Sequence, residues 1–266
     1  MEANFDYRRP VEIASGIFWV GFDDPASNLH CNPYIVIDHG EAAIIDAGSR
    51  SDFAIVMLKV LQTGISPGQI TTLIYQHADP DLCGSMLNMI DICNNPDLKI
   101  LSDPKNNTFI SFYVEKEKRE LIKSTSHYPE GLLVGKRRLK FFPTPYAHAA
   151  GSFVTYDEFT GTLFTSDLFG SISQKWDLYL ELKEKCFTCE SMDFCDSCPV
   201  KEILEFHRTI MPSEKALTHA MSVLEPLDLK LIAPQHGSII RKRADIELLT
   251  RHLKQLKGVG IDGIIP

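Results

Sequence analysis

Eight consecutive residues, 77–84, constrain the fold of this chain more than any other segment. They read His-Ala-Asp-Pro-Asp-Leu-Cys-Gly and directly follow an apolar run at 72–75, which predicts a buried strand. The spacing H-x-D-x-D places one imidazole and two carboxylates on a single turn after that strand. Because open α/β sheets bind their ligands at such strand ends, the segment predicts an α/β fold with a metal site at a sheet edge.

Three further candidate ligands occupy the same kind of position. His148, Asp167 and His236 each come shortly after an apolar, strand-like segment. A carboxylate such as Asp167 can bridge two cations about 3.5–4 Å apart, so the pattern favours a two-metal site. The other histidines lack metal spacing and are interpreted as structural, His207 among them, whereas His30 stands at a strand entrance. The candidate metal ligands are therefore His77, Asp79, Asp81, His148, Asp167 and His236.

The order of the predicted elements favours an αββα sandwich, with two packed β-sheets and helices outside. We expect a hairpin over 11–22, a pair of strands joined at 39–40, and helices over 52–63, 106–126, 201–222 and 243–257. Strands come first, then helices and strands alternate, and the second half repeats this order. The chain is therefore expected to form a single α/β domain over 1–266 with a pseudo-twofold arrangement.

Composition narrows the classes of partner. The chain has 266 residues, is 44% hydrophobic and carries a formal net charge of −8. Nucleic-acid binders usually carry a basic face, so no nucleic-acid partner is expected. No apolar run approaches the roughly 20 residues that span a bilayer, and the first residues lack the pattern of a secretory signal. We therefore expect a cytoplasmic protein without a membrane partner.

Four of the seven cysteines lie within 13 residues and form a second candidate metal site. Cys186, Cys189, Cys195 and Cys198 read C-x2-C-x5-C-x2-C, in an insert at about 180–200. Without an export signal, such pairs favour metal over disulfides. Four thiolates can hold one zinc or iron ion, or an iron–sulfur cluster, and the spacing leaves these alternatives open. Cys83 and Cys93 are interpreted as packing residues, and the sequence assigns Cys31 no role.

Together these motifs resemble the metallo-β-lactamase fold, and within it the di-iron domain of flavodiiron proteins. The series Ile45-Asp46, His77-x-Asp79-x-Asp81, His148, Asp167 and His236-Gly237 carries the resemblance, which covers about residues 10–255. It implies one iron on His77, Asp79 and His148, a second on Asp81 and His236, and Asp167 as the bridge. Tyr146, Phe169 and His30 are candidates, from sequence position, for the surroundings of these ligands.

Two positions depart from that resemblance. Position 82 is Leu, where many relatives place another histidine on the second iron, and position 79 is Asp, where flavodiiron proteins have Glu. Hydrolases of the superfamily show H-x-H-x-D-H, with nitrogen ligands that suit zinc. Histidine plus carboxylate with open positions suits non-haem iron better. The pattern is most similar to stand-alone oxygen-binding di-iron proteins.

The resemblance implies a di-iron protein that binds O2 at an open iron position, with NO as an alternative ligand. It would act as an oxygen sensor docking on a signalling receptor, or as an O2/NO reductase supplied by an electron donor in trans or by the four-cysteine centre. Flavodiiron proteins continue into a flavodoxin-like domain, whereas this sequence ends at Pro266, so we expect no FMN. A head-to-tail homodimer is expected by analogy. A zinc-dependent hydrolase of the same fold is the alternative.

Overall fold

The computed structural model describes residues 6–22, 30–172, 176–189 and 198–265. The chain divides into two compact units. Unit 1 comprises residues 1–24, 31–141 and 157–160, and unit 2 comprises residues 25–30, 142–156 and 161–266. The expected single domain over 1–266 stays a prediction.

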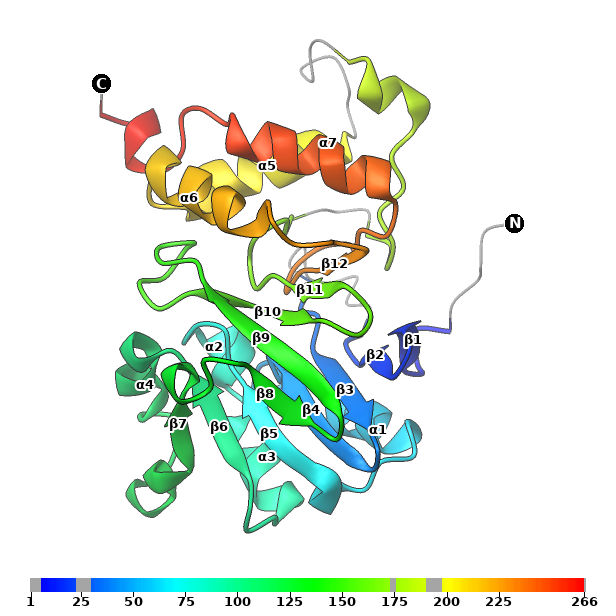
Figure 1. Cartoon of the computed structure of the whole chain (residues 1–266), viewed down its shortest axis with the longest axis vertical. Coiled ribbons are helices and arrows are strands. Elements are labelled where there is room, and N and C mark those ends of the chain that lie inside the picture. Colours follow the sequence, from blue (N-terminus) through cyan, green and yellow to red (C-terminus); the bar gives the residue numbers. More distant parts are fainter. Residues whose placement is uncertain (1–5, 23–29, 173–175, 190–197, 266) are drawn as a thin grey trace. The chain divides into compact units, whose positions relative to one another are not determined.

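Both strands and helices occur along the described chain, in the order shown in Figure 1. The strands are β1 (Val11–Ala14), β2 (Ile17–Trp19), β3 (Tyr34–Asp38), β4 (Glu41–Ile45), β5 (Ile70–Ile74), β6 (Lys99–Ser102), β7 (Ile122–Ser124), β8 (Leu132–Val134), β9 (Arg137–Pro143), β10 (Phe153–Asp157), β11 (Thr162–Phe164) and β12 (Leu231–Ala233). The α-helices are α1 (Phe53–Gln62), α2 (Pro80–Cys83), α3 (Met86–Cys93), α4 (Pro104–Ile110), α5 (Pro199–Ile210), α6 (Glu214–Leu224) and α7 (Arg243–Lys254). Short 3-10 helices are η1 (Pro67–Gln69), η2 (Lys116–Leu121), η3 (Thr125–His127), η4 (Glu184–Phe187) and η6 (Ile261–Gly263).

Unit 1 is built on a seven-stranded sheet in the order β1-β2-β3-β4-β5-β6-β7. Strands β1 to β4 pair antiparallel, and β4 to β7 pair parallel. The β3–β4 hairpin turns at His39 and Gly40, both with positive φ (48° and 80°), which is the backbone of a tight type I′ turn. The predicted hairpin over 11–22 and the predicted turn at 39–40 are therefore confirmed.

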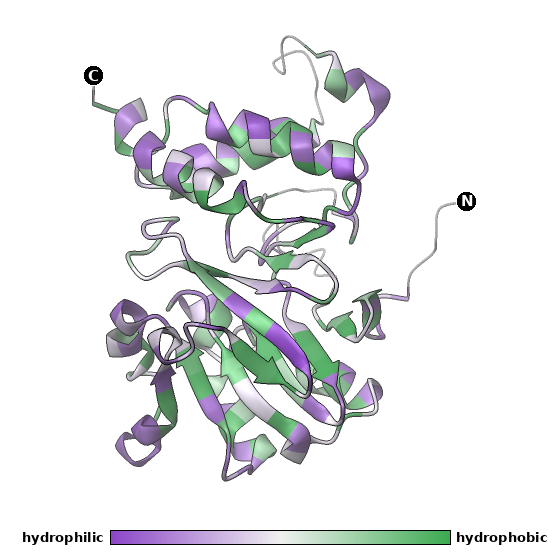
Figure 2. Ribbon diagram, in the orientation of Figure 1, coloured by the Kyte–Doolittle hydropathy of each residue, from purple (hydrophilic) through white to green (hydrophobic). Residues whose placement is uncertain are grey.

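Both faces of this sheet are covered within unit 1. On one face, apolar side chains of α1 and α3 form one cluster with Ile35, Ile44, Leu73 and Ile100 of β3 to β6. On the other face, β8 contacts β3 and β4. Parallel strands buried on both faces carry many apolar side chains, and Figure 2 shows hydrophobic segments along β3 to β6, interrupted by paler and purple ones. The carboxyl end of β5, which carries the H-x-D-x-D segment, is thus held by a sheet packed from both sides.

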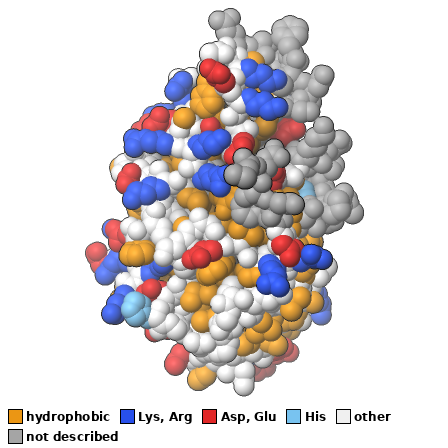
Figure 3. All heavy atoms as spheres, turned by 90° about the vertical axis from the view of Figure 1, so that its right-hand side faces the viewer, with side chains coloured by type: hydrophobic (Ala, Val, Ile, Leu, Met, Phe, Trp, Pro, Cys, Tyr) orange, Lys and Arg blue, Asp and Glu red, His pale blue; other side chains and the backbone are white. Residues whose placement is uncertain are grey.

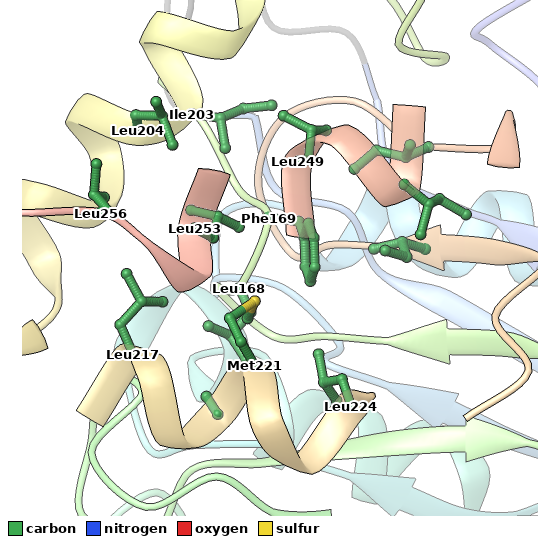
Figure 4. Close-up of a cluster of buried hydrophobic side chains, with 14 of the residues drawn as sticks. Leu168, Phe169, Ile203, Leu204, Leu217, Met221, Leu224, Leu249, Leu253 and Leu256 are labelled. Carbon is green, nitrogen blue, oxygen red and sulfur yellow. The ribbon is translucent and has the colours of Figure 1, made fainter. Parts of the chain in front are cut away.

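The second sheet has the strand order β12-β11-β10-β9-β8. In unit 2, β11 pairs parallel with β12, so both strands run in the same direction toward their carboxyl ends. Helices α5, α6 and α7 also belong to unit 2, and their leucine side chains surround Leu168 and Phe169 in one buried cluster (Figure 4). These two residues directly follow Asp167, so the core of unit 2 holds the loop after β11.

Two of the predicted helices are wrong in extent. The helix expected over 106–126 is α4, followed by the 3-10 helix η2 and strand β7, because Ile122 and its neighbours pair parallel with β6. The helix expected over 201–222 is two helices, α5 and α6. They are separated at Pro212, which lacks an amide hydrogen, and Ser213 caps α6 by accepting from the amide of Ala216.

The side of the molecule in Figure 3 shows no large patch of a single charge among the residues drawn in colour. Basic and acidic side chains lie interspersed among the residues drawn in colour there. Among the described helices, none combines the length and the apolar character that crossing a bilayer requires.

The core of unit 2 generates a stability prediction. Leu249 of α7 is fully buried in the cluster of Figure 4. Leu249→Ala should lower the free energy of unfolding by about 2–5 kcal/mol, because it removes buried methyl groups and leaves a cavity. Ile261→Ala is the control, since Ile261 is 54% exposed, and it should cost less than about 1 kcal/mol. Urea unfolding of the two variants measures the difference, and equal costs would contradict this packing.

Candidate metal centre

The chain that leaves β5 is fixed by a buried aspartate. Asp46 adopts a positive φ of 52° directly after β4, and its Oδ1 accepts a hydrogen bond of 2.9 Å from the amide of Gln76. The amide of Asp46 in turn donates to the carbonyl of Ile74 at the end of β5. In the sequence, Asp46 stands out only as part of a family resemblance. The structure gives it the function of holding the residue before His77.

Two further side chains hold the carbonyls of the turn. The Cys83 thiol donates to the His77 carbonyl over 3.6 Å, and the Tyr113 hydroxyl donates to the Ala78 carbonyl over 3.0 Å. Burial, with nearby carboxylates led by that of Asp46, raises the pKa of the Cys83 thiol well above its usual value. The thiol therefore keeps its proton and remains a donor. Cys83 is buried as expected, and it also orients the candidate ligand.

Gly84 follows the short helix α2 and lies close to the backbone of neighbouring residues. A Cβ placed there would lie 2.6 Å from the Pro80 carbonyl oxygen and 2.8 Å from the Arg50 amide nitrogen. Both neighbours are backbone atoms that cannot rotate away. Only glycine therefore allows α2, which carries Asp81, to pack where it does.

Within unit 1 the structure brings three candidate ligands together. One side-chain ligand atom each of His77, Asp79 and Asp81 lies within 4.8 Å of the other two. His77 is buried, and its Nε2 lies 3.7 Å from an Asp79 carboxylate oxygen. An imidazole and two carboxylates at this spacing form a donor set that suits a divalent cation.

Within unit 2 the structure brings the other three candidates together, with both histidines against Asp167. His148 Nε2 lies 2.7 Å from Asp167 Oδ2, and His236 Nε2 lies 3.6 Å from Asp167 Oδ1. Asp167 and His236 follow the parallel strands β11 and β12, and a hydrogen bond from the Gln235 amide to the Ser166 carbonyl joins the two loops. Both oxygens of one buried carboxylate thus face a histidine nitrogen.

A backbone carbonyl sets the orientation of His236. Its Nδ1 lies 3.1 Å from the carbonyl oxygen of His30, so Nδ1 is the nitrogen that donates and Nε2 faces Asp167. The His30 ring stacks on Trp176 with centroids 4.6 Å apart, and Trp176 Nε1 donates to the Gly237 carbonyl. His30 therefore lies beside a candidate ligand.

His207 is a residue that the sequence pattern indicates as merely structural. It is fully buried on α5, its Nδ1 donates to the Ile203 carbonyl, and its Nε2 accepts a 3.0 Å hydrogen bond from the amide of Phe169. Phe169 itself is buried with a positive φ of 65°. His207 thereby holds the loop two residues after Asp167. Its position four residues after Ile203, on the apolar face of a helix, is the only signal the sequence offers.

The remaining predicted residues are Tyr146 and the cysteines of the insert. Tyr146 lies in the loop before His148, has a φ of 63°, and its side chain is 56% exposed. In the insert, Cys186 belongs to η4, Cys189 is exposed, and Cys198 is buried at the start of α5. Cys195 lies outside the described residues. The four-cysteine site stays a prediction.

The neutral state of His207 generates a pH prediction. Burial lowers the pKa of its imidazole from 6.5 to about 4, and the Ile203 carbonyl and Asp167 oppose this shift. Between these values the unfolded chain binds the proton that the folded chain does not, so stability falls as pH falls from 6.5 toward 4. In metal-free protein this loss should reach up to about 3 kcal/mol relative to His207→Gln. Urea unfolding at stepped pH measures it, and parallel pH profiles would contradict it.

Comparison with known proteins places these motifs in a family. The family model described as "ODP family beta lactamase" matches residues 29–237. The type A flavoprotein of Rhodobacter capsulatus is 27% identical over 244 residues, covering 87% of this chain and 52% of that protein. The nitric oxide reductase of Moorella thermoacetica is 24% identical, covering 88% of this chain and 58% of that protein. The chain thus spans about half the length of these curated relatives.

Solved structures show the same fold. Rubredoxin oxygen:oxidoreductase from the anaerobe Desulfovibrio gigas aligns with a TM-score of 0.78 at 18% identity, over 93% of this chain and 61% of that one. A structure described as the peroxy di-iron species of the chemotaxis sensor ODP aligns with a TM-score of 0.75 at 22% identity, over 96% and 97%. These likenesses confirm the predicted metallo-β-lactamase-like α/β fold. The chain belongs to the ODP family of β-lactamase-fold proteins.

Proposed function

We propose that this chain is a non-haem di-iron protein that binds O2, with NO as an alternative ligand. The observation that carries the proposal is the arrangement around Asp167, whose two carboxylate oxygens each face a histidine Nε2. The proposal is supported by membership of the ODP family and by relatives described as flavoproteins and as a nitric oxide reductase.

The donor atoms present fit a cation. Because His236 donates through Nδ1 to the His30 carbonyl, its Nε2 carries a lone pair toward an oxygen of Asp167. Two acceptors facing each other repel unless a proton or a metal ion lies between them. Asp167 faces His148 through its other oxygen. A carboxylate with an imidazole on each side has the geometry of a bridge between two metal ions.

The two groups of ligands would be shared between two iron ions. One would be held by His77, Asp79 and His148, and the other by Asp81 and His236, with Asp167 as the bridge. The set contains three carboxylates and three imidazoles, and this mixture of oxygen and nitrogen ligands favours iron over zinc. Asp79, in place of the histidine of zinc hydrolases, is the residue on which this choice depends.

The chain would leave an open coordination position at one ion, and it holds the candidate ligands in place. Leu82 is fully buried and cannot coordinate a metal, so the ion at Asp81 keeps room for a diatomic ligand. Reduced iron, when bound, supplies the electrons that O2 takes up. The His30 carbonyl fixes the orientation of His236, and the His30 ring is itself held by stacking on Trp176.

Turnover separates a sensor from a reductase. The likeness to the chemotaxis sensor ODP extends over 97% of that chain, which supports oxygen sensing through a signalling receptor in trans. Reduction of O2 or NO would need electrons from a partner protein or from a metal centre at the four cysteines. We place sensing first, with slow reduction as the second role of the same site.

Removing the bridge tests the ligand assignment. Asp167→Ala should abolish paired metal binding, because each metal ion loses a ligand and the two lose their link. Elemental analysis of the variant should therefore show at least one metal ion fewer per chain than the wild type. Asp228→Ala, which removes an exposed carboxylate of unit 2, is the control and should leave the metal content unchanged. Retention of the full metal content in Asp167→Ala would refute the assignment.

Metal content and the response to oxygen test the function. Protein produced in iron-rich medium should contain about two iron ions per chain at this site, plus any bound at the cysteines. Anaerobically reduced protein should develop a new visible absorption band when O2 is added. A band that lasts indicates a sensor, and a band that decays as reductant is consumed indicates a reductase. Zinc alone, with no response to O2, would favour the hydrolase.

A further inference from the structure

Cys31, to which the sequence assigns no role, lies next to a candidate ligand in unit 1. The Sγ atom of Cys31 and a carboxylate oxygen of Asp81 lie within 4.8 Å of each other. The ligand atoms of His77, Asp79 and Asp81 lie within the same limit of one another. The thiol is half-buried rather than exposed. A sulfur atom therefore lies at ligand spacing from a carboxylate already assigned to a metal ion.

The backbone at Cys31 is fixed by both of its neighbours in the chain. The preceding residue, His30, offers the carbonyl that accepts from His236 Nδ1. The following residue, Asn32, is fully buried and accepts a 2.9 Å hydrogen bond from Trp19 Nε1 through its side chain. The carbonyl that orients one candidate ligand and the thiol beside another thus belong to consecutive residues. A thiol held in this way loses little conformational freedom when it binds a metal.

We propose that the Cys31 thiolate is a protein ligand of the metal ion assigned to Asp81 and His236. This inference rests on the proposed function. The thiolate would be the fourth protein ligand of that ion, beside Asp81, His236 and the bridge Asp167. Because non-haem iron takes more than four ligands, the ion would still keep room for a diatomic ligand. On binding, the thiol releases its proton to solvent and the sulfur forms one bond to the metal. Thiolate beside imidazole and carboxylate is a donor set that binds iron, cobalt and zinc.

Cobalt tests the sulfur–metal bond directly. The full chain, stripped of metal with a chelator, is titrated with Co²⁺ as wild type, Cys31→Ser and Cys31→Ala, and the near-ultraviolet spectra are compared. A sulfur-to-cobalt charge-transfer band should be weaker in both variants than in the wild type. The four insert cysteines are present in all three proteins, so their contribution cancels in the difference. The affinity for the second Co²⁺ of the pair should fall about tenfold or more.

Alkylation of individual cysteines gives a second measurement that does not depend on spectra. Iodoacetamide labelling followed by peptide mass spectrometry should show Cys31 modified at least about tenfold more slowly in wild type loaded with Co²⁺ than in metal-free protein. Cys93, a core residue of α3, is the matched control and should react at the same rate with and without metal. In Asp81→Ala the protection of Cys31 should be lost.

The outcomes separate the two proposals. If wild type and Cys31→Ser bind a metal pair with the same spectrum and affinity, and Cys31 is alkylated equally with and without metal, the ligand role of Cys31 is wrong and the two-metal function stands. If wild type binds no metal pair, the proposed function fails and the role of Cys31 fails with it. Loss of the band together with protection of Cys31 by metal supports both.

Discussion

Crowding of hydrogen-bond acceptors is the physical constraint on which the rest of this structure depends. His77 lies among carboxylates in unit 1, and in unit 2 two imidazoles lie against the Asp167 carboxylate. Such groups repel one another unless a proton or a metal ion lies between them, so a flexible chain would let them separate. The fold prevents this through backbone hydrogen bonds made by residues that are not themselves ligands. Asp46 and Cys83 act in this way in unit 1, and His207 and the His30 carbonyl do so in unit 2.

The supporting bonds differ in kind from the ligands they hold. The ligands follow strands and stand in a short motif, so local sequence marks them. Most supports are distant in the sequence, with separations of 30 positions between Asp46 and Gln76 and 38 between Phe169 and His207, whereas Cys83 is six positions from His77. Each support contributes an ordinary residue type with no characteristic spacing. This explains why the sequence could predict the candidate ligands and their strand ends, whereas it could not predict that His207 holds the loop after Asp167.

The same reasoning accounts for the errors in the predicted elements. Residues 106–126 have a composition that helices tolerate, and only pairing with β6 makes Ile122–Ser124 a strand. A partner strand about twenty residues away is invisible to local periodicity. In contrast, Pro212-Ser213 is a local signal for a helix break, and the long apolar pattern around it masks that signal. Positions 82 and 79 are informative from the sequence alone, because the single side chain at each position directly changes the set of metal-ligand atoms.

The close packing at Gly84 has a consequence for how this site can change. No ligand is at position 84, yet any side chain there would push against the backbone of Pro80 and Arg50 and move the helix that carries Asp81. Metal binding can therefore be lost through a residue that never approaches a metal. Natural or engineered changes at the candidate ligands should therefore determine the state of the centre only in a chain that keeps Gly84. A sequence that preserves every candidate ligand but replaces Gly84 would be a relative in fold with an altered or abandoned centre.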